Sequence, residues 1–147
     1  MFVDSSVWID HLRGLPTPEI RLLHDLLHDL APSSTVIDPV QIVIGDVVLL
    51  EVLRGIDDER QQQLARRTLT SFDLIEVGGT SVALAAVDHY RALRRQGITV
   101  RKAIDCLIAA WCIGNSVPLL HADRDFLPFV EHCGLLSADT ANVRATP

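Results

Sequence analysis

The sequence is poor in cysteine and in long apolar runs, and each shortage excludes a class of protein. Its three cysteines are odd in number and lack the paired short spacing of a zinc site or a redox motif, so we expect reduced core thiols. No apolar run reaches the roughly 20 residues that a membrane helix needs, and Asp4 stands where a secretory signal would carry positive charge. We therefore expect a cytoplasmic protein without a membrane segment.

Basic charge is also scarce and comes almost entirely from arginine. The chain has 13 Lys and Arg against 19 Asp and Glu, a formal net charge of −6, and Lys102 is its only lysine. Because phosphate contacts in nucleic-acid complexes are usually supplied by Lys and Arg, this balance argues against a broad electrostatic interaction with nucleic acid. Any such contact needs a local basic patch.

The remaining composition is that of one globular domain. A chain of 147 residues fits a single hydrophobic core, and 48% hydrophobic with 22% charged residues is an ordinary balance. We expect the domain to cover residues 1–138. Residues 139–147 have little apolar content and are predicted to form a flexible tail.

Short apolar runs alternate with longer amphipathic stretches, which is typical of an α/β protein with a parallel sheet. Strands are predicted over residues 1–3, 40–44, 74–77 and 117–121. Helices are predicted from residue 5 or 6 to 12 and over residues 18–30, 46–54, 58–69, 80–95 and 99–113. The last helix is apolar nearly all round and is expected in the centre of the domain.

Three acidic residues stand in apolar surroundings: Asp4 after the first strand, Glu51 within VVLLEVL and Asp105 within AIDCLIAAW. Burying a lone carboxylate costs several kcal/mol or forces its protonation, so each needs a partner. The partner is either one of the few nearby cations or a metal ion. Asp123 joins this set because it follows the last predicted strand, as Asp4 follows the first.

Ligands of open α/β sheets bind outside the carboxyl ends of the strands, where Asp4 and Asp123 are expected. Asp105 can reach the same place from a helix N-terminus. An all-carboxylate set of ligands suits Mg²⁺ or Mn²⁺. A pair of such ions can polarise a phosphate and generate hydroxide, so the acids favour phosphodiester hydrolysis.

Each acid taken alone also has a structural explanation. Asp4 can cap the following helix, Asp105 can complement its helix N-terminus, and Asp123 with Asp125 can form a turn. Glu51 is harder to explain, because a Glu inside an apolar window is usually paired or functional. The metal-site hypothesis therefore rests on the four acids taken together.

The ordered motifs MFVDSSVWID, VVLLEVLRG, RKAIDCLIAAWC and LLHADRDF resemble a PIN domain, and within that family the VapC-type toxins of type II toxin–antitoxin systems. The resemblance implies a three-layer sandwich with a central parallel sheet flanked by helices. It also implies that Asp4, Glu51, Asp105 and Asp123 meet in one catalytic cleft, with Asp4, Asp105 and Asp123 as metal ligands. Ser6 and Asp125 are predicted to support them.

The same resemblance implies a Mg²⁺- or Mn²⁺-dependent endoribonuclease that cuts structured RNA such as tRNA. It further implies inhibition by a cognate antitoxin and assembly as a homodimer. The candidate RNA contacts are Arg13, Arg54, Arg101, Lys102 and Arg124, each of which is otherwise an ordinary solvated charge.

Three rival interpretations compete with this one, and missing residues count against the first two. An aspartyl-phosphate phosphatase would need a second Asp where Ser6 stands and a lysine late in the chain, and a phospho-receiver module would need a lysine where His121 and Ala122 follow the last strand. The third is a catalytically silent PIN-like domain that only binds partners.

Overall fold

The computed structural model describes residues 1–31, 34–36 and 39–138, so the flexible tail predicted over residues 139–147 lies outside the described residues. In this part of the chain a parallel sheet has the strand order β3-β2-β1-β4. Its strands are β1 (Phe2–Val3), β2 (Val43–Gly45), β3 (Asp73–Ile75) and β4 (Leu119–Leu120). The predicted α/β class with a central parallel sheet is confirmed.

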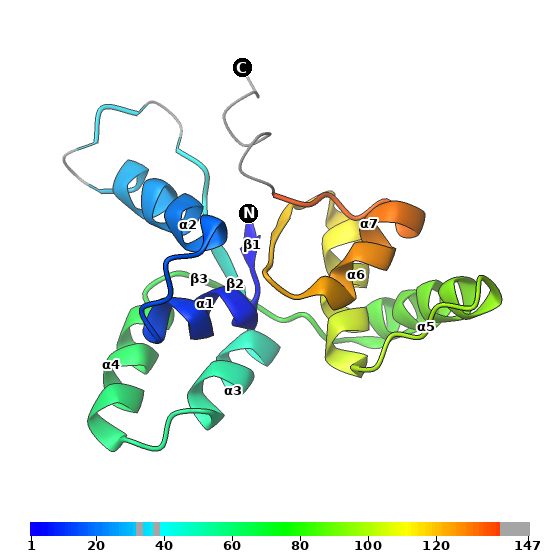
Figure 1. Ribbon diagram of the computed structural model, residues 1–147, viewed down its shortest axis with the longest axis horizontal. Coiled ribbons are helices and arrows are strands. Elements are labelled where there is room, and N and C mark those ends of the chain that lie inside the picture. Colours follow the sequence, from blue (N-terminus) through cyan, green and yellow to red (C-terminus); the bar gives the residue numbers. More distant parts are fainter. Residues whose placement is uncertain (32–33, 37–38, 139–147) are drawn as a thin grey trace.

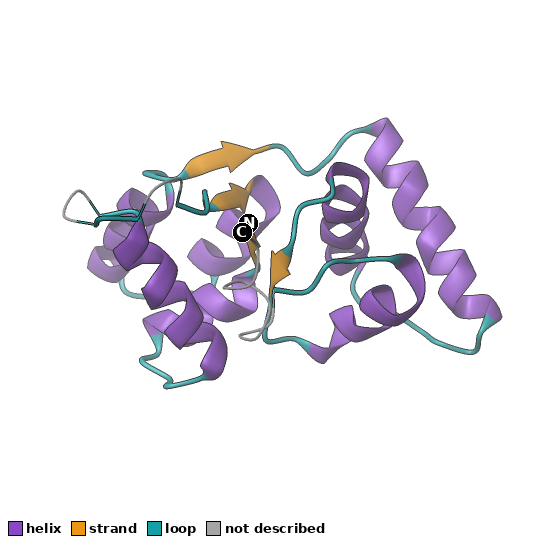
Figure 2. Ribbon diagram, turned by 90° about the horizontal axis from the view of Figure 1, so that it is seen from above, coloured by secondary structure: helices purple, strands orange, loops and turns teal. Residues whose placement is uncertain are grey.

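Two groups of helices enclose the sheet, with α1 to α4 on one side in Figure 1 and α5 to α7 on the other, and Figure 2 shows the strands between them. The first group is α1 (Ser5–Leu12), α2 (Pro18–Asp29), α3 (Asp46–Arg54) and α4 (Glu59–Leu69). The second group is α5 (Thr80–Arg95), α6 (Ala103–Asn115) and α7 (Leu127–Cys133), preceded by the short 3₁₀ helix η1 (Arg124–Phe126). This layering agrees with the predicted three-layer sandwich.

Helix starts follow the capping signals of the sequence. The Thr17 side chain accepts a hydrogen bond from the backbone of Ile20 at the start of α2, and Asp58 does the same for Gln61 at the start of α4. Gly55 follows the last residue of α3, where the sequence places the end of that helix.

One helix begins later than predicted: α6 starts at Ala103, whereas the sequence predicted a start at Thr99. The hydroxyl of Thr99 accepts a hydrogen bond of 2.6 Å from Arg94 at the end of α5. Val100 is buried in the connection, and the backbone of Lys102 is extended. Packing against α5 therefore takes the place of the expected helical turn.

The predicted strands are also longer than those observed. The run over residues 117–121 contributes only Leu119–Leu120 to the sheet, and the run over residues 40–44 contributes only Val43 and Ile44 to β2, which ends at Gly45. Leu120 pairs with Val3, and the backbone N–H of Asp4 donates to the carbonyl of Leu120 over 2.9 Å. The carboxyl ends of β1 and β4 consequently lie side by side.

The core is formed by large apolar side chains from both helix groups and from the sheet, among them Phe2, Trp8, Ile108, Phe126 and Phe129. The predicted central helix α6 buries both Cys106 and Cys112, whereas Cys133 is half-buried, and all three thiols are free. Within the described residues, every helix is too short or too polar to cross a membrane.

Candidate metal centre

Asp4 follows β1 directly and caps α1, and its side chain is only 3% exposed. One carboxylate oxygen, Oδ2, accepts hydrogen bonds from the backbone N–H of Ser6 at 2.9 Å and from the Ser6 hydroxyl at 2.6 Å. Burial raises the pKa of Asp4, the nearby Glu51 adds to this, and the hydrogen bonds from Ser6 oppose it. The capping explanation is therefore true of Asp4, but it leaves the burial of the carboxylate unexplained.

Ser6 connects the ends of two strands through its hydroxyl. Besides donating to Asp4, its Oγ accepts a hydrogen bond of 3.1 Å from the backbone N–H of Ala122, just after β4. A short polar side chain two residues after Asp4 therefore fixes both the Asp4 carboxylate and the loop that carries Asp123. This contact agrees with the supporting position predicted for Ser6.

Glu51 reaches the same region from α3, which begins immediately after β2 and packs against α1. The hydroxyl of Ser5 donates a hydrogen bond of 2.8 Å to Glu51 Oε2. The sequence interpretation offered Ser5 only as a possible cap of the first helix and did not predict its contact with Glu51. Its position between Asp4 and Ser6, at the end of β1, was the available signal.

Asp105 lies in the first turn of α6 and is 3% exposed. Among the described residues, its Oδ2 atom is buried without a hydrogen-bond partner, and the Lys102 ammonium lies 3.9 Å away. Burial raises the pKa of Asp105 to about 7, the Lys102 charge opposes this, and the neighbouring carboxylates of Asp4, Asp123 and Glu51 raise it further.

Asp123 follows β4 and caps η1 by accepting a hydrogen bond of 3.0 Å from the backbone N–H of Asp125 at Oδ1. Its other oxygen, Oδ2, lies 2.7 Å from the Lys102 ammonium. Burial tends to raise the pKa of Asp123, but these two donors outweigh it and lower the pKa below its usual value. The predicted turn at Asp123 and Asp125 is present.

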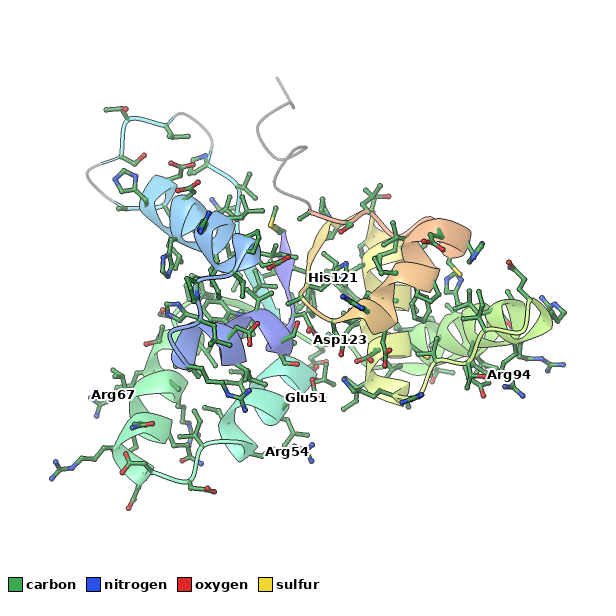
Figure 3. The ribbon with its side chains drawn as sticks, in the orientation of Figure 1. Glu51, Arg54, Arg67, Arg94, His121 and Asp123 are labelled. Carbon is green, nitrogen blue, oxygen red and sulfur yellow. The ribbon has the colours of Figure 1, made fainter. Side chains whose placement is uncertain are left out.

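These acids line one open cleft of about 550 Å³. Its walls include all four predicted catalytic residues, Asp4, Glu51, Asp105 and Asp123, which come from four separate segments of the chain. Figure 3 shows Glu51 close to Asp123, although α3 and the loop after β4 are distant in sequence. The fold thus brings the four acids together, while their roles as ligands and catalysts stay predictions.

The predicted basic residues lie in three places. Arg54 and Lys102 line the cleft, and Arg13 lines an adjoining hollow beside Asp57 and Asp58. Arg101 and Arg124 are outside the cleft wall. Lys102 contacts carboxylates of the cluster, as a cation close to Asp105 in sequence can, and its role as an RNA contact stays a prediction.

The donor set fits a hard divalent cation. Asp105, Asp123 and Asp125 can each offer one carboxylate oxygen, and these atoms lie within 4.8 Å of one another. In the described part of the chain, Asp105 Oδ2 is buried without a hydrogen-bond partner, as expected of a carboxylate oxygen whose partner is a metal ion. Oxygen ligands of this type suit Mg²⁺ and Mn²⁺ better than soft metals.

Comparison with known proteins identifies the family. A family model described as PIN domain matches residues 1–129. Ribonuclease VapC11 of Mycobacterium tuberculosis is 29% identical over 126 residues, which cover 86% of this chain and 88% of the relative. VapC ribonuclease Mb1587 of Mycobacterium bovis matches with the same identity and coverage. The resemblance expected from the sequence motifs is confirmed.

Solved structures share the fold. The structure of VapBC2 from Rickettsia felis, bound to a DNA fragment from its promoter, superposes with a TM-score of 0.69 at 17% identity and covers 92% of this chain and 95% of that chain. VapBC-1 from nontypeable Haemophilus influenzae gives a TM-score of 0.67 at 17% identity, covering 94% and 96%.

Proposed function

The chain belongs to the PIN-domain family, and on that premise we propose that it is a divalent-metal-dependent endoribonuclease, the toxin of a toxin–antitoxin pair. The observation that carries the proposal is the meeting of Asp4, Glu51, Asp105 and Asp123 in one cleft. The relatives named as VapC ribonucleases support RNA as the substrate. With the family known, an aspartyl-phosphate phosphatase or a receiver module no longer competes.

We assign the cation to Asp105, Asp123 and Asp4, which line the cleft together with Glu51. An oxygen of Asp125 lies within 4.8 Å of oxygens of Asp105 and Asp123, so Asp125 can complete the site. When bound, Mg²⁺ or Mn²⁺ would supply hydroxide near neutral pH and stabilise the negative charge of the phosphate. Ser6 holds the Asp4 carboxylate in place, and Ser5 does the same for Glu51. These hydroxyls restrict the orientation of the acids before any ion or RNA arrives.

The RNA is proposed to enter along the open side of the cleft. Arg54 is exposed on α3 and lines the cleft, so it is the best placed of the arginines to contact a phosphate. Arg13, Arg101 and Arg124 are candidates to extend the contact. Structured RNA such as tRNA remains the proposed substrate class, and three free thiols agree with the proposed cytoplasmic location.

An antitoxin is the proposed partner, because solved relatives are described as toxin–antitoxin complexes or as VapBC assemblies. A pocket of about 380 Å³ between α1 and α4 offers an apolar surface for it, with the buried Trp8 and Leu69 in its wall. Leu12 and Leu64 are 49% and 67% exposed at this pocket. Because α1 also carries Ser5 and Ser6, a segment seated here would run towards the cleft.

A homodimer is the proposed assembly. Leu84 and Val87 lie about one turn apart on α5 and are 62% and 51% exposed, so this helix presents a small apolar surface. This helix lies away from the α1–α4 pocket, on the opposite side of the molecule in Figure 1. A dimer through α5 would therefore leave the proposed antitoxin pocket accessible.

RNA cleavage with defined metals tests the nuclease proposal. Wild-type protein should cut RNA with Mg²⁺ or Mn²⁺ and leave 5′-phosphate and 3′-hydroxyl ends, and Asp4→Asn and Asp105→Asn should remove the activity. Asp88→Asn, on an exposed position of α5, is the matched control and should stay active. Cleavage that persists in excess chelator would contradict the proposal, and partner binding without cleavage under any of these metals would favour the catalytically silent domain.

A further inference from the structure

Lys102 occupies an unusual place for the only lysine of the chain. It immediately precedes α6, and its ammonium lies 2.7 Å from Asp123 Oδ2 and 3.9 Å from Asp105 Oδ2. Those two aspartates belong to the group whose oxygens could hold a metal ion. A cation supplied by the chain itself therefore stands between proposed ligands.

We propose that the Lys102 ammonium is the resident counter-ion of the acidic cluster in the metal-free protein, and that Lys102 must swing out of the cluster before a divalent cation can bind. The inference rests on the metal site of the proposed function. It adds a residue that sets metal affinity, and it treats Lys102 as a positioning residue rather than a ligand.

Mutual exclusion follows from the geometry of the contacts. An ion shared by Asp105 Oδ2 and Asp123 Oδ2 would lie roughly 2.0–2.6 Å from each, in the space beside both oxygens that the Lys102 ammonium takes at 3.9 Å and 2.7 Å. The two positive charges would also repel each other beside a buried carboxylate, where water screens them little. Lys102 and the metal are therefore alternative partners of Asp123 and Asp105.

The Lys102 side chain is able to leave. It is 54% exposed, whereas the side chain of Asp105 is 5% exposed and enclosed by the core. An ammonium on a flexible four-carbon stem makes a point contact, which is easier to release than the bidentate pair that arginine forms with a carboxylate. Movement of Lys102 into solvent would open the cluster without disturbing α6.

Metal affinity provides the first test. Free Mn²⁺ in equilibrium with wild type, Lys102→Met and Arg91→Met is measured by its electron paramagnetic resonance signal. Lys102→Met keeps most of the side-chain length but removes the competing charge, so it should bind Mn²⁺ at least about tenfold more tightly than wild type. Arg91→Met removes an exposed positive charge from α5 and should stay within about twofold of wild type.

Lysine-selective ¹³C labelling provides a second test that needs no variant, because the sole lysine gives a single side-chain signal. Adding Mg²⁺ should move the Lys102 Cε signal to the position of a solvated lysine, in step with the amide signals of α6. If the amide signals report Mg²⁺ binding while the lysine signal stays fixed, or if Lys102→Met and wild type bind Mn²⁺ equally, the inference is overturned. Absence of Mg²⁺ and Mn²⁺ binding in all forms would instead refute the metal site itself.

Discussion

Replacing Asp105 by asparagine tests the acidic cluster through the stability of the metal-free protein. Burial, together with the repulsion of neighbouring carboxylates, raises the pKa of Asp105 from 3.8 to about 7 despite the opposing charge of Lys102. A raised acid pKa means that the folded protein binds this proton more tightly than the unfolded chain does. The free energy of unfolding therefore decreases as pH rises from about 4 to about 7, and this contribution is constant at higher pH.

The size of the effect follows from the shift. A difference of about three pKa units between folded and unfolded protein corresponds to about 4 kcal/mol in total. The asparagine side chain carries no charge at any of these pH values, so the variant lacks this pH-dependent penalty. Relative to wild type, the unfolding free energy of Asp105→Asn should increase by about 3 kcal/mol between about pH 5 and about pH 8.

Urea unfolding in excess chelator measures this difference, and using the difference cancels the titration of the other acids and histidines. Asp88→Asn, which removes an exposed carboxylate from α5, should show a difference that changes little with pH. Mn²⁺ should narrow this difference, since a ligand at 100 times its dissociation constant adds about 2.7 kcal/mol to the wild type. If Asp105→Asn differs from wild type by the same amount at every pH, Asp105 does not carry the destabilised charge described above.

Two further substitutions test the surroundings of the cleft and the proposed partner surface. Ser6→Ala removes the hydroxyl between Asp4 and Ala122 and should lower metal affinity or RNA cleavage about 10- to 100-fold. The control Ser81→Ala, on the exposed start of α5, should change neither quantity. Equal Mn²⁺ titrations and equal cleavage rates for the two variants would argue that Ser6 does not orient Asp4. Leu64 is 67% exposed, so Leu64→Asp should leave RNA cleavage and the melting temperature close to those of the wild type. It should weaken the antitoxin complex in a pull-down or calorimetric titration. Undiminished antitoxin binding would mean that the antitoxin binds elsewhere.

Much of the fold could be predicted because its signals are local. The starts of α2 and α4 and the end of α3 are set by Thr17, Asp58 and Gly55, which act within a few residues of their own position. The strands were harder, since a strand extends only as far as its neighbours pair with it. The Leu119–Leu120 strand is therefore much shorter than the apolar run that contains it.

The acids that line the cleft could also be picked out from the sequence, three of them by their apolar surroundings and Asp123 by its place after a predicted strand. The side chains that form hydrogen bonds with these acids could not be predicted from the sequence. Lys102 contacts Asp123 across 21 positions, and Ser5 contacts Glu51 across 46. Such pairs depend on how α1, α3, α6 and the loop after β4 meet in space, so the sequence could name Lys102 as a cation close to Asp105 and as a candidate RNA contact, but not its contact with Asp123.

Two aspartates with the same local role show why capping does not explain the cleft. Asp58 and Asp4 each accept a hydrogen bond from a backbone N–H in the first turn of a helix. Asp58 is exposed, where water solvates its charge at no cost, whereas Asp4 is 3% exposed beside Glu51 and has a raised pKa. Burial does not improve a helix cap, because desolvation disfavours the ionised carboxylate, which is the stronger acceptor of the backbone hydrogen bond. A bound cation would offset the cost of burying Asp4, and in our proposal that cation lies in the cluster around Asp105.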